Sequence, residues 1–455
     1  MLVLPSVLAA PLLLAAAVSD APKLTIESCE FGEVYAFHDV ECQFDVQNTG
    51  DKPVRVIDAI PSRPGDKALA KGLVIAPHSH AYLPVQLKTE NGTGYNQHPF
   101  RLRTDDGLEY GANAHGFVMS VLDQTHPEID FGVVESDGSE VDKTIALSSA
   151  EAPNFRLTKV MDAPAWVNAH IQEDGHTLRA NVRHGADWGI ATGFVKLQTN
   201  NEAQKEVWVA VKSDIRGAIV PAFNPLDVGL LHMGDNNTFR IPLHSKTDRP
   251  FEINSAKLEG AVGEVKAVPC EPVAADCRWL EVKIADAQGK GFVKGTVRVT
   301  FPHEKATLSV DVRGFLVDKD FVAKTIDEST LRGESATGAP AAGSSVLPLQ
   351  NAIANAVRQS NETVPPGNGP LLRWHVANGR SIHGFQIFRG ESEQGPFVLL
   401  NRPTLPSSAE DEESAGYNYR DNSAESGKTY WYYIGLVFND GRKQQLTGPQ
   451  KIVAK

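Results

Sequence analysis

The sequence is poor in positive charge. Its 455 residues include 44 lysines and arginines against 56 aspartates and glutamates, which gives a formal net charge of -12 at pH 7. No stretch concentrates lysine or arginine, whereas a protein that binds a phosphate backbone needs such a basic surface. The composition therefore excludes nucleic acid as an expected partner, and we expect the acidic surface to serve solubility.

Catalytic motifs are missing as well. The chain has no Gly-Xaa-Ser-Xaa-Gly elbow, phosphate-binding loop, His-Glu-Xaa-Xaa-His or Gly-Xaa-Gly-Xaa-Xaa-Gly after a strand-like run. Carboxylate pairs are not diagnostic in a chain with 56 acidic residues. We therefore predict a protein that is not an enzyme and that holds no cofactor.

The sequence does not favour a metal site, although it has 14 histidines. His78 and His80 would share one face of a strand, but no aspartate or glutamate lies nearby in sequence, and His98 and His115 lie elsewhere in the same repeat. The acidic run at residues 410–413 lacks the alternating ligand spacing of a calcium loop. We interpret His78 and His80 as solvated turn residues and predict no metal.

Long hydrophobic runs are confined to the N-terminus. Residues 2–18 are apolar and uncharged, and small residues follow where a signal peptidase could cut. We predict a signal peptide over residues 1–22 and a periplasmic or secreted protein. The alternative is an uncleaved N-terminal membrane anchor, because no lysine or arginine precedes the run and Pro5 and Pro11 interrupt it.

Cysteine is scarce, and its four residues fall into two local pairs. Cys29 with Cys42, and Cys270 with Cys277, fit two disulfides in an oxidising compartment. Four unrelated buried thiols are the alternative. The pairs lie in different repeats, which argues against a zinc site built from all four.

What the sequence does contain is a repeated opening. Phe31-Gly32-Glu33-Val34 recurs at residues 131–134 as Phe-Gly-Val-Val and at residues 228–231 as Val-Gly-Leu-Leu, at a period of about a hundred residues. Each repeat closes with two alternating strands joined by a turn, which in the second repeat falls at Asn200-Asn201 between residues 194–199 and 207–211. Short alternating runs with many glycines and prolines predict an all-β chain of tandem Ig-like β-sandwiches.

The repeats are followed by a change of composition. Residues 333–345 are rich in glycine, alanine and serine and have little apolar bulk, which is typical of a flexible linker. Residues 346–358 have the spacing of a short amphipathic helix. The predicted organisation is a signal peptide (1–22), Ig-like repeats (23–122, 123–220 and 221–319), a linker with this helix (320–368) and a last β-sandwich (369–455).

Two resemblances follow from these motifs. Trp374, the run at residues 384–389, the Gly-Pro-Phe turn at 395–397 and Ser426-Gly427-Lys428-Thr429-Tyr430 make the last domain resemble a bacterial fibronectin type III domain. That resemblance implies that Tyr430 is the tyrosine-corner residue of the fold. The upstream repeats resemble the Hydin-like, major-sperm-protein-like Ig fold and a poorly characterised bacterial exported family built on it, through the Phe-Gly-Xaa-Val opening and Asn48-Thr49-Gly50. Ile60-Pro61-Ser62 replaces the Cys-Gly-Cys of many members of that family.

Strand alternation singles out four aromatic residues as candidates for binding. If Tyr430 and Tyr432 face the core of the last domain, then Phe388, Trp431 and Tyr433 project from the opposite face of neighbouring strands. We interpret these three as an exposed contact patch, with cover by the linker helix or the third repeat as the alternative. Trp208 is also expected to point outward, with packing against a neighbouring repeat as the favoured explanation.

These observations predict an exported, non-catalytic scaffold or adhesion-type protein. We expect it to bind another envelope or extracellular protein through the aromatic residues. The alternative is a carbohydrate-binding protein that stacks glycans on the exposed aromatics of the C-terminal domain. Neither hypothesis involves nucleic acid, or a membrane beyond the N-terminal anchor considered above.

Overall fold

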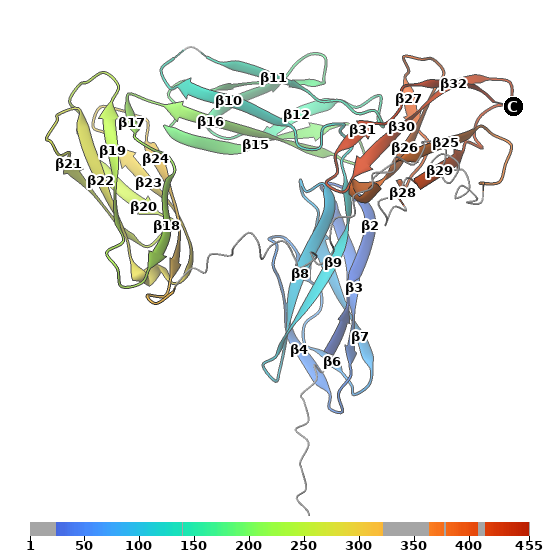
Figure 1. Ribbon diagram of the computed structural model, residues 1–455, viewed down its shortest axis with the longest axis horizontal. Coiled ribbons are helices and arrows are strands. Elements are labelled where there is room, and N and C mark those ends of the chain that lie inside the picture. Colours follow the sequence, from blue (N-terminus) through green and yellow to red (C-terminus); the bar gives the residue numbers. More distant parts are fainter. Residues whose placement is uncertain (1–23, 139, 322–363, 377–378, 408–414, 455) are drawn as a thin grey trace, which may run out of the picture. The chain divides into compact units, whose positions relative to one another are not determined.

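The computed structural model describes residues 24–138, 140–321, 364–376, 379–407 and 415–454. The described chain forms two compact units, one ending at Met119 and one beginning at Ser120. Strands dominate it and build four β-sandwiches in chain order (Figure 1), so the predicted all-β, Ig-like fold class is confirmed. The predicted signal peptide and the predicted helix at 346–358 lie outside the described residues.

The first sandwich has a four-stranded sheet, in the order β1-β3-β7-β5, and a five-stranded sheet, in the order β2-β9-β8-β4-β6. Alternation turns Phe44 and Phe100 into its core, where their rings meet edge-on at 5.5 Å. The predicted disulfide between Cys29 and Cys42 is confirmed and joins the two sheets. The strands are β1 (Leu24–Glu27), β2 (Cys29–Tyr35), β3 (Asp39–Asn48), β4 (Val54–Pro61), β5 (Lys67–Ala68), β6 (Leu73–Ile75), β7 (His80–Lys88), β8 (Gly94–Thr104) and β9 (Glu109–Met119).

The second sandwich has sheets in the orders β10-β16-β15-β12 and β11-β14-β13. Val207, Val209 and Val211 alternate into its core, as the β-branched pattern predicts. The predicted closing hairpin is confirmed, because β15 and β16 pair antiparallel. The strands are β10 (Glu128–Glu135), β11 (Asp142–Ala146), β12 (Leu157–Asp162), β13 (Val167–Ile171), β14 (Thr177–Val182), β15 (Gly189–Thr199) and β16 (Glu206–Arg216).

The third sandwich has sheets in the orders β17-β19-β22-β21 and β18-β24-β23-β20. Leu243 and Val282 from one sheet and Val297 and Val310 from the other are fully buried. The elements are β17 (Ile219–Pro221), β18 (Leu226–His232), β19 (Thr238–Ser245), β20 (Ser255–Glu259), β21 (Gly263–Pro269), β22 (Cys277–Ile284), the 3-10 helix η1 (Asp286–Gln288), β23 (Gly291–Thr300) and β24 (Leu308–Val317).

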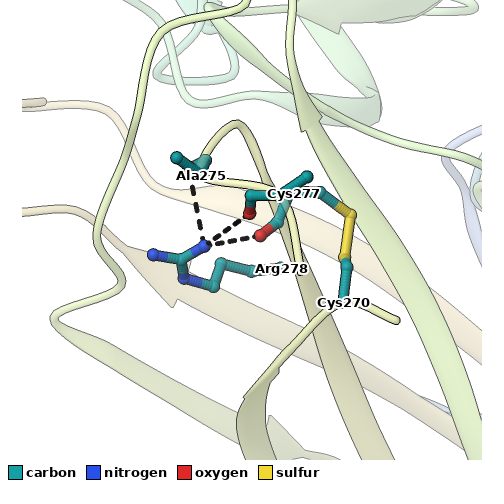
Figure 2. Close-up of a disulfide and its surroundings, with 5 residues drawn as sticks. Cys270, Ala275, Cys277 and Arg278 are labelled. Atoms are coloured by element: carbon teal, nitrogen blue, oxygen red, sulfur yellow. Dashed lines mark hydrogen bonds between the residues drawn. A yellow bond between two sulfur atoms is a disulfide. The ribbon is translucent and has the colours of Figure 1, made fainter. Parts of the chain in front are cut away.

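The second predicted disulfide, between Cys270 and Cys277, is also confirmed and closes the loop from β21 to β22 (Figure 2). The Arg278 guanidinium lies beside it and donates hydrogen bonds from Nη1 to the carbonyl oxygens of Cys277 (2.6 Å), Ala274 (3.2 Å) and Ala275 (3.4 Å). One side chain thus binds three carbonyl oxygens at the point where the loop enters β22.

The fourth sandwich pairs β25 with β29 and builds a second sheet on β27-β26-β30-β31, to which β28 adds at β26 and β32 at β30. Its core is aromatic, and Trp374, Phe385 and Tyr417 form one ring cluster. The Tyr430 hydroxyl accepts a hydrogen bond (3.3 Å) from the backbone N–H of Glu425, five residues upstream. The elements are β25 (Leu371–Val376), the 3-10 helix η2 (Gly379–Ser381), β26 (Ile382–Gly390), β27 (Phe397–Leu399), β28 (Leu405–Pro406), β29 (Ala415–Arg420), β30 (Thr429–Phe438), β31 (Lys443–Gln445) and β32 (Gln450–Val453).

The repeated Phe-Gly opening is a β-bulge. In the first three sandwiches an opening strand pairs in parallel with the closing strand, as β2 with β9, β10 with β16 and β18 with β24, and each pairing shifts register at the motif. Gly32, Gly132 and Gly229 have φ of +69°, +71° and +63° there, a conformation that glycine adopts without strain. The motif therefore marks the same backbone feature three times.

Trp188 joins the second sandwich to the third. Its indole is buried over Gly217, where an added Cβ would lie 1.8 Å from the ring, and it packs at 5.6 Å from Phe301. Its backbone also bridges to the third sandwich, because the Trp188 N–H donates to the Thr307 carbonyl and the Ser309 N–H donates to the Trp188 carbonyl, both at 2.9 Å. Backbone bonds and a buried ring fix this junction together.

Candidate binding surfaces

The aromatic residues predicted for binding lie where the strand pattern placed them. Phe388 lies on β26, Trp431 and Tyr433 lie on β30, and their side chains leave the sheet on the face opposite Tyr430 and Tyr432. Phe388 and Tyr433 are directly paired across the two strands. The predicted register is therefore present in the structure.

The expectation that Phe388 is exposed is wrong. Its side chain is only 4% exposed, and its ring stacks on that of Tyr433 with centroids 4.6 Å apart and planes 9° from parallel. The Phe397 ring packs edge-on against the Tyr433 ring, with centroids 4.9 Å apart. Trp431 stands apart from this stack and is partly exposed, with the Lys451 ammonium 5.6 Å from its ring centre.

The second sandwich, and not the third, contributes the residues beside the stacked pair. A cavity of about 210 Å³ is lined by Asp123 and Glu151 of the second sandwich together with Phe388, Tyr433 and Lys443 of the fourth. Burial, followed by the nearby Asp123 carboxylate, raises the pKa of the Tyr433 hydroxyl. We call this group of five residues the docking contact.

Buried charges hold the docking contact. The Lys443 ammonium donates to the Ser120 carbonyl at 2.5 Å and lies 3.7 Å from the Glu151 carboxylate, whose side chain is 1% exposed. The same carboxylate accepts a hydrogen bond from the Gln386 amide at 3.3 Å and lies 3.7 Å from the Arg402 guanidinium. Burial lowers the pKa of Lys443. Sequence reasoning missed Asp123, Glu151 and Lys443, because no local pattern connects these residues to one another or to Phe388 and Tyr433.

Trp208 lies on the outer face of the second sandwich. Its ring is partly exposed and contacts Phe194, whose side chain is 43% exposed, at a centroid distance of 5.3 Å. The indole N–H donates to the Glu206 carboxylate, and the Lys196 ammonium lies 5.0 Å from the ring centre. The result is an aromatic pair on the outer face of the sheet, bordered by charges of both signs.

The histidines divide into two kinds. His78 and His80 are exposed, as predicted, and lie 2.9 Å from Asp51 and 3.2 Å from Asp45 respectively. Among the described residues, no group of three or more histidine, cysteine, aspartate or glutamate side chains could hold a metal ion.

His98, by contrast, is completely buried, which the sequence reasoning did not anticipate. Its Nδ1 lies 2.8 Å from Asp66 and its Nε2 lies 3.1 Å from Arg63. Because a guanidinium only donates, Nε2 accepts and Nδ1–H donates to the carboxylate. The signal was present in the alternation, since His98, Phe100 and Leu102 share one face of β8.

Comparison with known proteins adds no family. No family model matches the chain, and no curated protein matches it in sequence. Solved structures that it is similar to include the ASH/PapD-like domain 7 of human CEP192, at 10% identity and a TM-score of 0.20, covering 26% of this chain and 99% of that one.

Two further similar structures belong to different classes of protein. One holds the N-terminal eight Ig domains of Down Syndrome Cell Adhesion Molecule, at 12% identity and a TM-score of 0.23, covering 95% of this chain and 54% of that one. The other is an endo-fucoidan hydrolase from glycoside hydrolase family 107, at 8% identity and a TM-score of 0.17, covering 64% of this chain and 43% of that one. Likeness at this level carries no argument about function.

The disulfides bear on the compartment. Disulfides persist in oxidising environments, so the two bridges fit an extracellular or periplasmic location. No helix in the described part of the chain is long and apolar enough to cross a membrane.

Proposed function

We propose that this protein is an exported, non-catalytic scaffold of Ig-like sandwiches that binds another envelope or extracellular protein. The observation that carries the proposal is the pair formed by Trp208 and Phe194. Large aromatic side chains that reach solvent side by side on a sheet face are typical of protein contact sites, where tryptophan is enriched among the residues that dominate binding energy.

The surroundings of the pair also favour a protein partner. Lys196 and Glu206 border the aromatic rings, which gives an apolar centre with a polar, charged rim. A rim of both signs suits a surface that carries its own mixture of charges. Within this proposal the binding face lies on the second sandwich and not on the C-terminal domain, because Phe388 and Tyr433 are taken up by the docking contact.

The alternative, a carbohydrate-binding protein, also relies on exposed aromatic side chains. An experiment can distinguish it from the scaffold proposal. Trp431 remains partly exposed on the fourth sandwich, so a glycan could stack on it without Phe388 or Tyr433. A glycan array probed with the full chain and with Trp431→Ser tests this. Specific glycan binding that Trp431→Ser removes would favour a carbohydrate-binding protein over the scaffold.

The test of the scaffold proposal is quantitative crosslinking in envelope extracts. A Trp208→Ser/Phe194→Ser chain should lose the crosslinked partners of the unaltered chain, whereas Val453→Ser, which changes a 55% exposed side chain on the fourth sandwich, should keep them. Circular dichroism checks that all three chains are folded. An unchanged set of partners for the double variant would contradict the proposal.

A further inference from the structure

The third sandwich exposes a row of apolar side chains across three adjacent strands. Leu230 on β18, Phe315 on β24 and Phe292 on β23 are register partners, in that order, on the outer face of the sheet. Their side chains are 42%, 38% and 83% exposed, and the two phenylalanine rings meet edge-on at 5.0 Å. Exposed apolar side chains that adjoin one another, unlike single ones, are typical of a contact site. We call these three residues the apolar row.

A row of charges runs parallel to the apolar row on the same face. Asp227 on β18, Arg313 on β24 and Lys294 on β23 are register partners in the same order, and all three are exposed. The row is therefore negative at the β18 side and positive at the β23 side. We call these residues the charged row.

We propose that this face is a self-association surface whose partner is a second copy of the same chain. Place a two-fold axis between two such sheets, parallel to their strands. The rotation exchanges the β18 side with the β23 side and keeps the direction along the strands, so the apolar row of one copy meets the apolar row of the other. Asp227 of each copy then faces Lys294 of its mate, which is the self-complementary pattern that a two-fold interface requires.

The remaining members of the two rows fit the same arrangement. Phe315 lies at the centre of the apolar row and meets its own copy, while Leu230 meets Phe292. Arg313 also meets its own copy, and its guanidinium lies 3.8 Å from Asp311 on the same strand, which reduces the repulsion. Sheets pack face to face about 10 Å apart, a distance that these side chains fill. The patch is small, so the association is weak and depends on concentration.

Sedimentation velocity of the full chain over a range of concentrations tests the proposal. The unaltered chain should show a reversible monomer–dimer equilibrium, and Phe292→Ser should weaken it about tenfold or more, because it removes the most exposed aromatic ring of the apolar row. Val273→Ser is the matched control, because Val273 is 82% exposed in the same sandwich but lies in the loop between β21 and β22. A monomer at every concentration would overturn the proposal, as would equal effects of the two substitutions.

A charge exchange identifies the two-fold arrangement itself. Lys294→Asp should prevent dimerisation, because the introduced aspartate of one copy would then lie against Asp227 of the other, and Asp227→Lys should do so by opposing two lysines. Mixed together, the two variants should form a heterodimer, because the charges are then opposite at both ends of the charged row. Asp227 of the first variant faces Lys294 of the second, and the aspartate introduced at position 294 faces the lysine introduced at position 227. Failure of the mixture to associate, with both variants folded by circular dichroism, would overturn the two-fold pairing. Should Asp227→Lys disturb the bulge it supports through the Gly229 N–H (3.0 Å), Phe292→Ser still decides whether the face associates.

Discussion

Phe388 and Tyr433 lie ring to ring, 4.6 Å apart, beside a glutamate that belongs to another sandwich. This relationship changes the meaning of the aromatic pattern in the last domain. Outward-facing aromatics on adjacent strands indicated a ligand surface, but here they complete an interface within the chain. The Glu151 and Lys443 side chains are the polar part of that interface.

Removing the Glu151 charge should loosen the docking contact. Glu151→Gln leaves the buried Lys443 ammonium without its carboxylate, and we expect docking to weaken by about 1 to 3 kcal/mol. Hydroxyl-radical footprinting read by mass spectrometry should then show increased labelling of Phe388 and Tyr433. Glu425→Gln is the control, because its ion pair with Lys428 is exposed, and it should leave the footprint unchanged. Equal footprints for all three chains would show that Glu151 does not hold the contact.

Asp421 should contribute far more than Asp440 to the stability of the fourth sandwich, although both aspartates pair with arginine. Asp421 is buried and accepts hydrogen bonds from Tyr432 and Arg389, both at 2.8 Å, so Asp421→Asn should destabilise the fourth sandwich by about 2 to 4 kcal/mol. The exposed pair of Asp440 with Arg442 predicts less than about 1 kcal/mol for Asp440→Asn. Native-state hydrogen exchange at β26 and β30 measures the difference. Equal loss of protection in both variants would contradict it.

The same aspartate predicts an acid dependence. Burial by itself would raise its pKa, but hydrogen bonds from Ser423, Tyr432 and Arg389 hold the pKa of Asp421 below its ordinary 3.8. A carboxyl whose folded pKa is depressed contributes its full stabilisation above the unfolded pKa and loses it as the pH falls through the folded value. Hydrogen-exchange protection in the fourth sandwich should therefore decrease at pH values below about 4. This acid-induced decrease should be smaller in Asp421→Asn than in the unaltered chain.

Alanine at the bulge glycine should cost stability through the backbone alone. A Cβ at Gly132 meets nothing within 4 Å, but its φ of +71° is strained for alanine, which predicts a loss of about 1 to 2 kcal/mol for Gly132→Ala. Gly111→Ala is the matched control, since Gly111 also has open space and an ordinary strand φ, and it should be neutral or stabilising. Hydrogen exchange in β10 and β16 measures the stability change of Gly132→Ala, and exchange in β8 and β9 measures that of Gly111→Ala. A neutral Gly132→Ala would contradict the role of the bulge.

The two disulfides should stabilise by similar amounts despite their different positions. Their sequence separations of 13 and 7 predict losses of about 3 and about 2.5 kcal/mol when the pairs Cys29/Cys42 and Cys270/Cys277 are replaced by alanine. Hydrogen exchange in the first and third sandwiches measures each loss separately. Alkylation without reduction should find no free thiol, and labelled cysteine in the folded protein would contradict the pairing.

Much of the fold followed from local patterns. Alternation at residues 207–211 and 430–436 predicted which side chains enter each core, because a strand assigns faces residue by residue whatever lies above it. The Phe-Gly motif likewise counted the repeats correctly. Its physical meaning, a bulge in a parallel strand pair, needed the register with a strand at the far end of each repeat.

The surfaces were harder to predict, because exposure depends on contacts between sandwiches. Phe388 was assigned to the correct face, yet the residues beside it come from positions 123 and 151, which no local pattern connects to it. Trp188 escaped notice for the same reason, since its partners lie at residues 301–309. The apolar row was missed for the same reason. Its three residues are far apart in sequence, and only the register of β18, β24 and β23 shows that Leu230, Phe315 and Phe292 are neighbours.

The parallel pairing of opening and closing strands also has a mechanical consequence. In each of the first three sandwiches the chain enters at one end of the pair and leaves at the other, as with β10 and β16. A stretching force applied to the two ends slides these strands past each other, so their hydrogen bonds bear load together instead of opening one at a time. When the chain is stretched, the parallel strand pair in each of the first three sandwiches is therefore loaded in shear.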